Sequence, residues 1–111
     1  MPPFPMLRHK ADFEALGRNG TARSTRLLVL RSLRTGRPET RIGLSTPRSL
    51  GGAVQRNRVR RRLREVVRER LDAIGPGWDL LLIARPEAAT ARYAELRDAL
   101  GSLLERSGIV K

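Results

Sequence analysis

Hydrophobic and polar residues in the N-terminal half of the chain follow a pattern that predicts one helix and two strands. Apolar side chains recur at helical spacing over residues 10–19, and this short helix is predicted to end near Gly17 and Gly20. The compact apolar run at residues 27–33 is typical of a strand. Residues 41–45 alternate polar and apolar side chains, as a half-buried strand does.

The C-terminal half begins with a longer helical pattern over residues 53–74. Glycine and proline at residues 75–77 end this helix, and the nearly continuous apolar run at residues 78–84 is typical of a strand covered on both faces. A last helix has apolar residues at helical spacing from Tyr93 onward and ends near Gly108. The apolar stripe of the longer helix spans an arc of about 140° and consists of Val59, Leu63, Val66, Val67, Leu71 and Ile74.

Together the elements predict an α+β fold, a small two-layer sandwich with three helices and a mixed sheet of about four strands. The order is α-β-β-β-α-β-α when residues 20–25 are counted as an additional strand. The strand–helix–strand unit at residues 41–84 favours a parallel pair of strands. One domain is expected at residues 10–108, with a flexible, Pro-rich basic arm at 1–9 and a tail at 109–111.

The composition excludes several classes of site. The 111 residues suffice for about one domain, and the absence of cysteine excludes a disulfide framework, a thiolate zinc site and a cysteine nucleophile. The single histidine excludes a multi-histidine metal site. No apolar run approaches the roughly 18 residues of a membrane span. The first residues lack the apolar segment of a secretory signal, so a cytoplasmic location is expected.

The charge of the chain points to a class of partner. The formal net charge is +12, and only two of the 23 basic residues are lysines. Half of that net charge lies between residues 56 and 70, where eight arginines accompany two glutamates. Because the planar guanidinium binds phosphate through two donors at once, this predicts a polyanionic partner, nucleic acid first and an anionic membrane surface second. Opposite the apolar stripe, a helical wheel places Asn57, Arg58, Arg61, Arg64 and Arg68.

The arginine-rich segment resembles the signature of a known family, the protein subunit of bacterial ribonuclease P. The family pattern is G-x-A-V-x-R-N-R-x-[KR]-R-x-x-R, and this chain reads Gly51-Gly52-Ala53-Val54-Gln55-Arg56-Asn57-Arg58-Val59-Arg60-Arg61-Arg62-Leu63-Arg64. Three further blocks agree in order and spacing: Asp12-Phe13, Arg41-Ile42-Gly43-Leu44-Ser45 and Asp79-Leu80-Leu81-Leu82-Ile83-Ala84-Arg85. The resemblance covers most of the chain, from about residue 7 to about residue 104.

This resemblance implies that the chain binds a large catalytic RNA, as its 1:1 partner, and assists removal of the 5′ leader from precursor tRNA. The RNA supplies the active site and binds most of the Mg²⁺, so no catalytic or metal-binding residue is expected in the protein. The implied fold is like domain 2 of ribosomal protein S5, with a left-handed crossover between parallel strands.

The resemblance also implies two sets of binding residues. The residues implied to contact the RNA subunit are Arg56, Asn57, Arg58, Arg60, Arg61, Arg62, Arg64 and Arg68. Those implied to contact the leader, in a cleft between the first helix and the sheet, are Phe13, Arg31, Ser45 and Arg48.

The chain departs from the family pattern around the implied leader site. Gly17 stands where a second aromatic residue is frequent, and Arg31 stands where a strand aromatic is common. The usual S-K-K run is replaced by residues 46–49, which carry one positive charge instead of two. Stacking a base on an aromatic ring contributes about 1–3 kcal/mol. Leader binding is therefore expected to use guanidinium stacking and phosphate contacts instead.

Three alternatives remain for the basic segment. A general RNA-binding protein, such as a ribosomal protein or an RNA chaperone, would use the same helix without needing a second site around Phe13. A DNA-binding regulator would need a partner helix just upstream of residue 53, where the pattern predicts a strand and a Gly51-Gly52 break. A membrane-surface helix would expose to lipid the apolar stripe that the small core needs.

Overall fold

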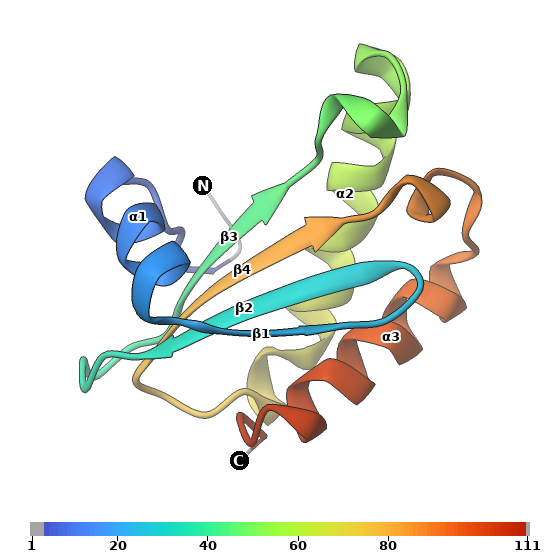
Figure 1. Ribbon diagram of the computed structural model, residues 1–111. Coiled ribbons are helices and arrows are strands. Elements are labelled where there is room, and N and C mark those ends of the chain that lie inside the picture. Colours follow the sequence, from blue (N-terminus) through green and yellow to red (C-terminus); the bar gives the residue numbers. More distant parts are fainter. Residues whose placement is uncertain (1–3, 111) are drawn as a thin grey trace.

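The chain forms a four-stranded sheet with two helices on one face and one helix on the other (Figure 1). The structure is a computed structural model that describes residues 4–110. The helices are α1 (Lys10–Asn19), α2 (Ala53–Arg70) and α3 (Tyr93–Arg106). The strands are β1 (Thr21–Ser24), β2 (Leu28–Arg34), β3 (Arg41–Ser45) and β4 (Trp78–Ala84). Short 3₁₀ helices are η1 (Arg48–Leu50), η2 (Leu71–Ala73) and η3 (Pro86–Thr90).

The sheet is mixed and has the strand order β1-β2-β4-β3. Strand β4 pairs antiparallel with β2 and parallel with β3, so the predicted parallel pair is confirmed. In Figure 1 the chain runs up β3, descends along α2 behind the sheet, and runs up β4 to the right of β3. That path is left-handed, against the strong general preference for right-handed crossovers, as the family resemblance implied.

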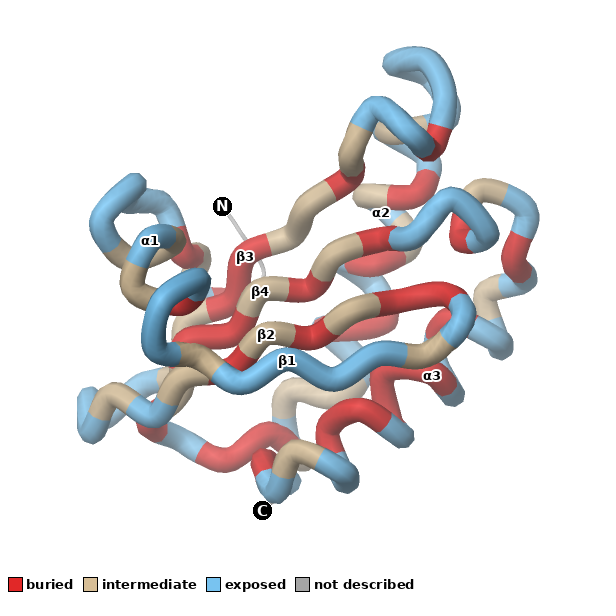
Figure 2. The backbone as a smooth tube through the Cα atoms, in the orientation of Figure 1, coloured by how far each residue is buried: buried red, intermediate tan, exposed pale blue. Residues whose placement is uncertain are grey.

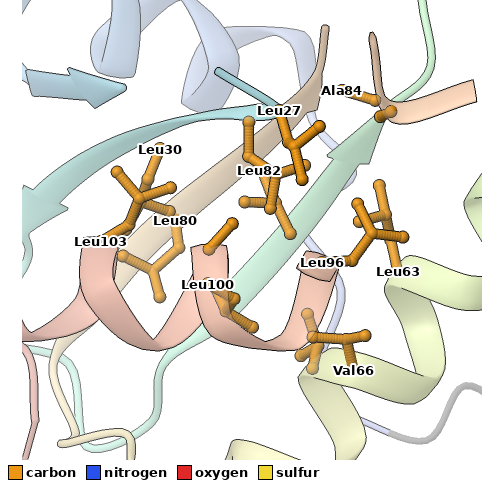
Figure 3. Packing of buried hydrophobic residues seen from close by; sticks show 14 of the residues in the cluster. Leu27, Leu30, Leu63, Val66, Leu80, Leu82, Ala84, Leu96, Leu100 and Leu103 are labelled. Carbon is orange, nitrogen blue, oxygen red and sulfur yellow. The ribbon is translucent and has the colours of Figure 1, made fainter. Parts of the chain in front are cut away.

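The main core lies between the sheet and the two helices α2 and α3 (Figure 3). Alternate residues of the central strands, such as Leu30 and Leu82, point toward these helices and are almost completely buried. Four of the six predicted stripe residues lie on α2 and are buried in this core, among them Leu63 and Val66. The predicted helix is too long at its C-terminal end, because α2 ends at Arg70 and both Leu71 and Ile74 lie beyond it. Exposed positions follow the outer faces of the helices, as Figure 2 shows. The stripe therefore fixes which face of α2 is free to meet a partner.

The prediction of a flexible arm at residues 1–9 is wrong for the described part of that segment. Phe4 and Leu7 are both buried. The Ile42 N–H donates to the Pro5 carbonyl over 3.0 Å, and the Leu7 N–H donates to the Ile42 carbonyl over 3.1 Å. The segment thus covers the free edge of β3, where unpaired backbone groups otherwise remain exposed. Residues 1–3 of the predicted arm lie outside the described residues.

The predicted tail at residues 109–111 is also packed where it is described. Ile109 is buried, and its carbonyl accepts a 2.8 Å hydrogen bond from the Gly75 N–H. Val110 forms an antiparallel bridge with Ile74. The segment after α3 therefore closes the core near the end of α2, and Lys111 lies outside the described residues.

Candidate nucleic-acid interface

Helix α2 begins at a sharp break after β3. Gly51 has φ 127°, a conformation that L side chains rarely adopt, and Gly52 is the N-cap. Glycine has no side chain to accept hydrogen bonds from the first-turn N–H groups, but the Gln55 side chain reaches back, and its Oε1 accepts a 3.0 Å hydrogen bond from the Gly52 N–H. The first turn contains no acidic residue. The N-terminal half of the helix thus combines a positive helix end with arginine side chains.

The outer face of α2 carries the most exposed part of the predicted RNA-binding set. Asn57, Arg58, Arg61 and Arg64 are exposed, and their spacing repeats at about one helical turn. Three of them, together with Arg60, line an open hollow of about 420 Å³. The hydrogen-bond donors of this hollow come from three guanidinium groups and one side-chain amide. Such a set of donors suits phosphate oxygens.

Four of the predicted RNA-binding arginines make contacts within the protein. Arg56 donates through Nε to the Thr46 carbonyl over 3.0 Å, and Arg60 donates through Nη2 to the Thr46 hydroxyl over 2.7 Å. Arg62 donates to the Ala91 carbonyl over 3.0 Å. Arg68 donates to a Glu65 carboxylate oxygen over 2.7 Å, and this hydrogen bond holds the pKa of Glu65 below its usual range. Arg56, Arg60 and Arg62 thus tie α2 to the segments that follow β3 and precede α3, whereas the Arg68 contact stays within α2.

The sheet face beside α1 brings together three of the four predicted leader-binding residues. The strand register aligns Arg31, Leu81 and Gly43 in one row across β2, β4 and β3. Two residues farther along β3, on the same face of the sheet, lies Ser45 beside Ile83. Phe13, on α1, lies directly over Gly43, because a Cβ built on that glycine would meet the ring at 3.1 Å. The glycine thus leaves room for the aromatic ring to approach the sheet.

This sheet face is apolar and only partly covered. Val29, Leu33, Leu81 and Ile83 are all half-buried. Arg31 is half-buried among them and forms no ion pair with any residue from 4 to 110. A partly exposed apolar surface with one unpaired guanidinium suits an unstacked base and its phosphate.

The fourth predicted leader-binding residue, Arg48, is placed differently. It lies on η1 just after β3, and its side chain is exposed beyond the sheet rather than on its face. It therefore stands between the sheet face and the N-terminal end of α2. The structure does not bring it into the group formed by Phe13, Arg31 and Ser45.

A cluster of charged residues beside this face was not foreseen from the sequence. Arg41 donates through Nε and Nη2 to both carboxylate oxygens of Asp79, over 3.0 and 2.7 Å, and through Nη1 to Asp12 over 3.2 Å. The two carboxylates raise the pKa of Arg41 above its ordinary value, with the Asp79 hydrogen bond the largest cause. The sequence alone does not predict this cluster, because Arg41 and Asp79 become neighbours only through the parallel register of β3 and β4.

Among residues 4–110, no three His, Asp or Glu side chains gather closely enough to hold a metal ion. None of the helices in the same range is long and apolar enough to cross a membrane.

Comparisons with known proteins agree on one family. The profile of the Ribonuclease P family matches residues 1–108. The ribonuclease P protein component of Roseiflexus sp. (strain RS-1) is 38% identical over 106 residues, which cover 95% of this chain and 87% of that relative. The RNase P protein of Thermotoga maritima superimposes with a TM-score of 0.83 at 27% identity, over 91% of this chain and 96% of that one.

A second solved structure shows the same fold at greater sequence distance. The RNase P protein of Staphylococcus aureus superimposes with a TM-score of 0.86 at 24% identity, over 96% of this chain and 97% of that one. The backbone arrangement is thus shared even where most side chains differ. This chain therefore belongs to the ribonuclease P protein family, whose members are the auxiliary protein subunit of the enzyme that processes the 5′ end of tRNA.

Proposed function

We propose that this chain binds the ribonuclease P RNA through the outer face of α2, and the 5′ leader of precursor tRNA across the sheet face beside α1. The observation that carries the proposal is the separation of two surfaces of different chemistry on one small domain. One is charged and lies on the outer face of α2, built from Asn57, Arg58, Arg61 and Arg64. The other is apolar, with Phe13 above it and Arg31 within it.

The charged surface of α2 suits a folded RNA. Its arginines project from a helix whose opposite face is fully buried, so they are held at fixed spacing without a cost in core packing. Neighbouring like charges destabilise a free helix, and phosphates of a partner remove that repulsion. Each phosphate neutralised adds a contribution to affinity that falls as salt rises. We assign this surface to the RNA subunit, with one protein for each RNA.

The apolar surface suits a single strand. Double-stranded RNA is contacted mainly through its phosphates and 2′-hydroxyls, whereas an unpaired leader exposes bases that can stack on Phe13 and on the Arg31 guanidinium. A protein that only bound folded RNA would have no need of this second surface. The precursor tRNA, with its unpaired leader, is the substrate that uses both.

The chemistry of cleavage belongs to the RNA in this proposal. We assign Mg²⁺ binding mainly to the RNA subunit, as the family resemblance implies. The protein contributes affinity and position, holding the leader so that the cleavage site lies in the RNA active site. A ribonucleoprotein of this kind works in the cytoplasm, where precursor tRNA is made.

Substitution of Phe13 tests the leader-binding surface. Phe13→Leu keeps an apolar side chain over Gly43 but removes the aromatic face, so it separates stacking from packing. The quantity to measure is the leader-dependent gain, the affinity of the reconstituted holoenzyme for precursor tRNA divided by its affinity for mature tRNA. Stacking one base contributes about 1–3 kcal/mol, so its loss is expected to lower this gain by about 5- to 150-fold.

Two controls accompany this measurement. Affinity for the RNA subunit should be unchanged in Phe13→Leu, because the ring lies on the other face of the sheet from α2. Affinity for mature tRNA should also be unchanged, because it has no leader. Equal losses for precursor and mature tRNA would show that Phe13 supports the fold and does not contact the leader.

A further inference from the structure

Helix α1 is short and lies outside the main core. It has ten residues, and its N-cap, His9, makes no side-chain hydrogen bond to the first turn. Its one fully buried residue, Leu16, lies outside the main core between the sheet and the other helices. Isolated helices of this length are marginal in water, and a glycine such as Gly17 weakens them further. The position of α1 must therefore be fixed by its contacts with the sheet.

The charged cluster supplies a specific contact of this kind. The Arg41 guanidinium, on β3, uses all three of its nitrogens, two toward Asp79 on β4 and one toward Asp12 on α1. The cluster is largely shielded from water, with side-chain exposures of 13% for Arg41, 5% for Asp79 and 21% for Asp12. Charged hydrogen bonds in such surroundings are stronger and more directional than exposed ones.

The geometry points to a positioning role for this cluster in leader binding. We propose that Arg41, held by Asp79, fixes α1 through Asp12 in the orientation that places the next residue, Phe13, over Gly43 and toward the leader. The cluster does not touch the leader in this proposal and acts only through Phe13. The inference rests on the proposed leader-binding role of this sheet face.

Asp12 can be changed without disturbing the rest of the charged cluster. Asp79 and Arg41 form a two-pronged pair between adjacent strands, and this pair belongs to the sheet itself. Asp12 adds a single hydrogen bond from outside the sheet. Removing the Asp12 charge therefore frees α1 but leaves the buried Arg41–Asp79 pair intact. Changing Arg41 would instead leave the buried Asp79 carboxylate without its partner, and changing Asp79 would remove both hydrogen bonds of the pair within the sheet, so either change threatens the fold.

The decisive variant is Asp12→Asn, with Glu14→Gln as its matched control. Both substitutions lie on α1 and remove one negative charge. Glu14 is exposed, and its carboxylate lies 3.8 Å from the Lys10 ammonium at the helix surface. Both variants change the general attraction to RNA equally, so a difference between them reports the contact with Arg41. Asp12→Asn is expected to lower the leader-dependent gain by about threefold or more, whereas Glu14→Gln leaves it unchanged.

A double variant tests whether the cluster acts through Phe13. In a Phe13→Leu background, Asp12→Asn should cause no further loss of the leader-dependent gain, because the ring it positions is already gone. Affinity for the RNA subunit and for mature tRNA should equal that of the Glu14→Gln control in both variants that carry Asp12→Asn, and that of the unmodified protein in Phe13→Leu alone. Independent, multiplicative losses would overturn the positioning role and would instead place Asp12 in direct contact with RNA.

Amide hydrogen exchange provides a readout that does not depend on leader binding. In Asp12→Asn the amides of α1 should exchange at least about tenfold faster, while those of α3 are unchanged. If Phe13→Leu alone leaves the leader-dependent gain intact, the assignment of the leader to this face fails, and hydrogen exchange still decides whether Arg41 fixes α1. Unchanged exchange in α1 would overturn the positioning role of Arg41.

Discussion

Arg61 and Arg97 carry the same charge in different surroundings, and the proposal assigns them different roles. Arg61 lines the open hollow on α2. Arg97, on α3, is exposed beside Asp98 and lies outside the arginine-rich helix. Arg61→Ala should weaken binding of the RNA subunit and flatten the slope of log affinity against log salt by about 0.7–0.9, one phosphate contact. Arg97→Ala, the control, should leave the slope unchanged, and equal changes in both variants would remove the special role of the α2 face.

Tyr93 gives the structure a measurable signature at high pH. Its hydroxyl donates a 2.6 Å hydrogen bond to Glu69 of α2. Burial, together with this hydrogen bond and the nearby negative charge, raises the pKa of Tyr93 to about 12. Because Tyr93 is the sole tyrosine, ultraviolet absorbance of tyrosinate reports it alone. The folded protein should titrate near 12, and Glu69→Gln should shift the midpoint toward the ordinary value of 10.

The raised pKa of Tyr93 means that the protein should become less stable at high pH. The unfolded chain loses the Tyr93 proton near pH 10, before the folded protein does, so alkali favours the unfolded state. Stability attributable to Tyr93 is complete below pH 10 and is lost as the pH rises toward about 12. A folded-state midpoint at the ordinary value would show that the contact between α2 and α3 at this point is absent in solution.

Individual residues differ in how far the sequence could place them. The exposed positions of Arg58 and Arg61 follow from helical periodicity alone, because their angular distance from the apolar stripe fixes them. The contacts of Arg56 and Arg60 with Thr46 could not be predicted, since they depend on where β3 ends relative to α2. The Arg41 cluster was hidden for the same reason, because strand register is a property of the folded sheet.

At the scale of elements, α2 depends on its buried stripe. Leu63, on α2, is fully buried in the core between this helix, the sheet and α3. Leu63→Ala should lower the free energy of unfolding by about 2–5 kcal/mol, because it removes apolar contacts and leaves a cavity. The neighbouring exposed substitution Arg64→Ala should change it by less than about 0.5 kcal/mol. Denaturant unfolding measures both, and a near-neutral Leu63→Ala would show that α2 is rotated from this orientation.

Elements with a clear hydrophobic periodicity were predicted well from the sequence, and segments without such a periodicity were not. Helix α1 and strands β3 and β4 have the predicted bounds, because glycine, proline and clear changes of period flank them. Residues 4–7 have no period, so their proline content suggested a loose arm. Their apolar side chains instead fill a gap beside β3, a tertiary effect that local sequence does not encode.

At the scale of the whole molecule, the sheet separates two functions. Its buried face anchors α2 and so presents the arginines outward, while its other face carries α1 and the apolar surface beside it. The two surfaces meet near the end of β3, where Ser45 lies on the sheet face and Thr46 accepts hydrogen bonds from Arg56 and Arg60. A single RNA–substrate complex can therefore contact both surfaces at once.

Cleavage of precursor tRNA by a bacterial ribonuclease P RNA at low Mg²⁺, with and without this protein, tests the proposed function most directly. Neutralised phosphates lower the repulsion between the RNA subunit and its substrate, so the protein should restore cleavage under conditions where the RNA alone is slow. Protein-dependent release of the intact 5′ leader at the mature end is the predicted result. Tight, salt-sensitive binding of the RNA without any stimulation of cleavage would contradict it.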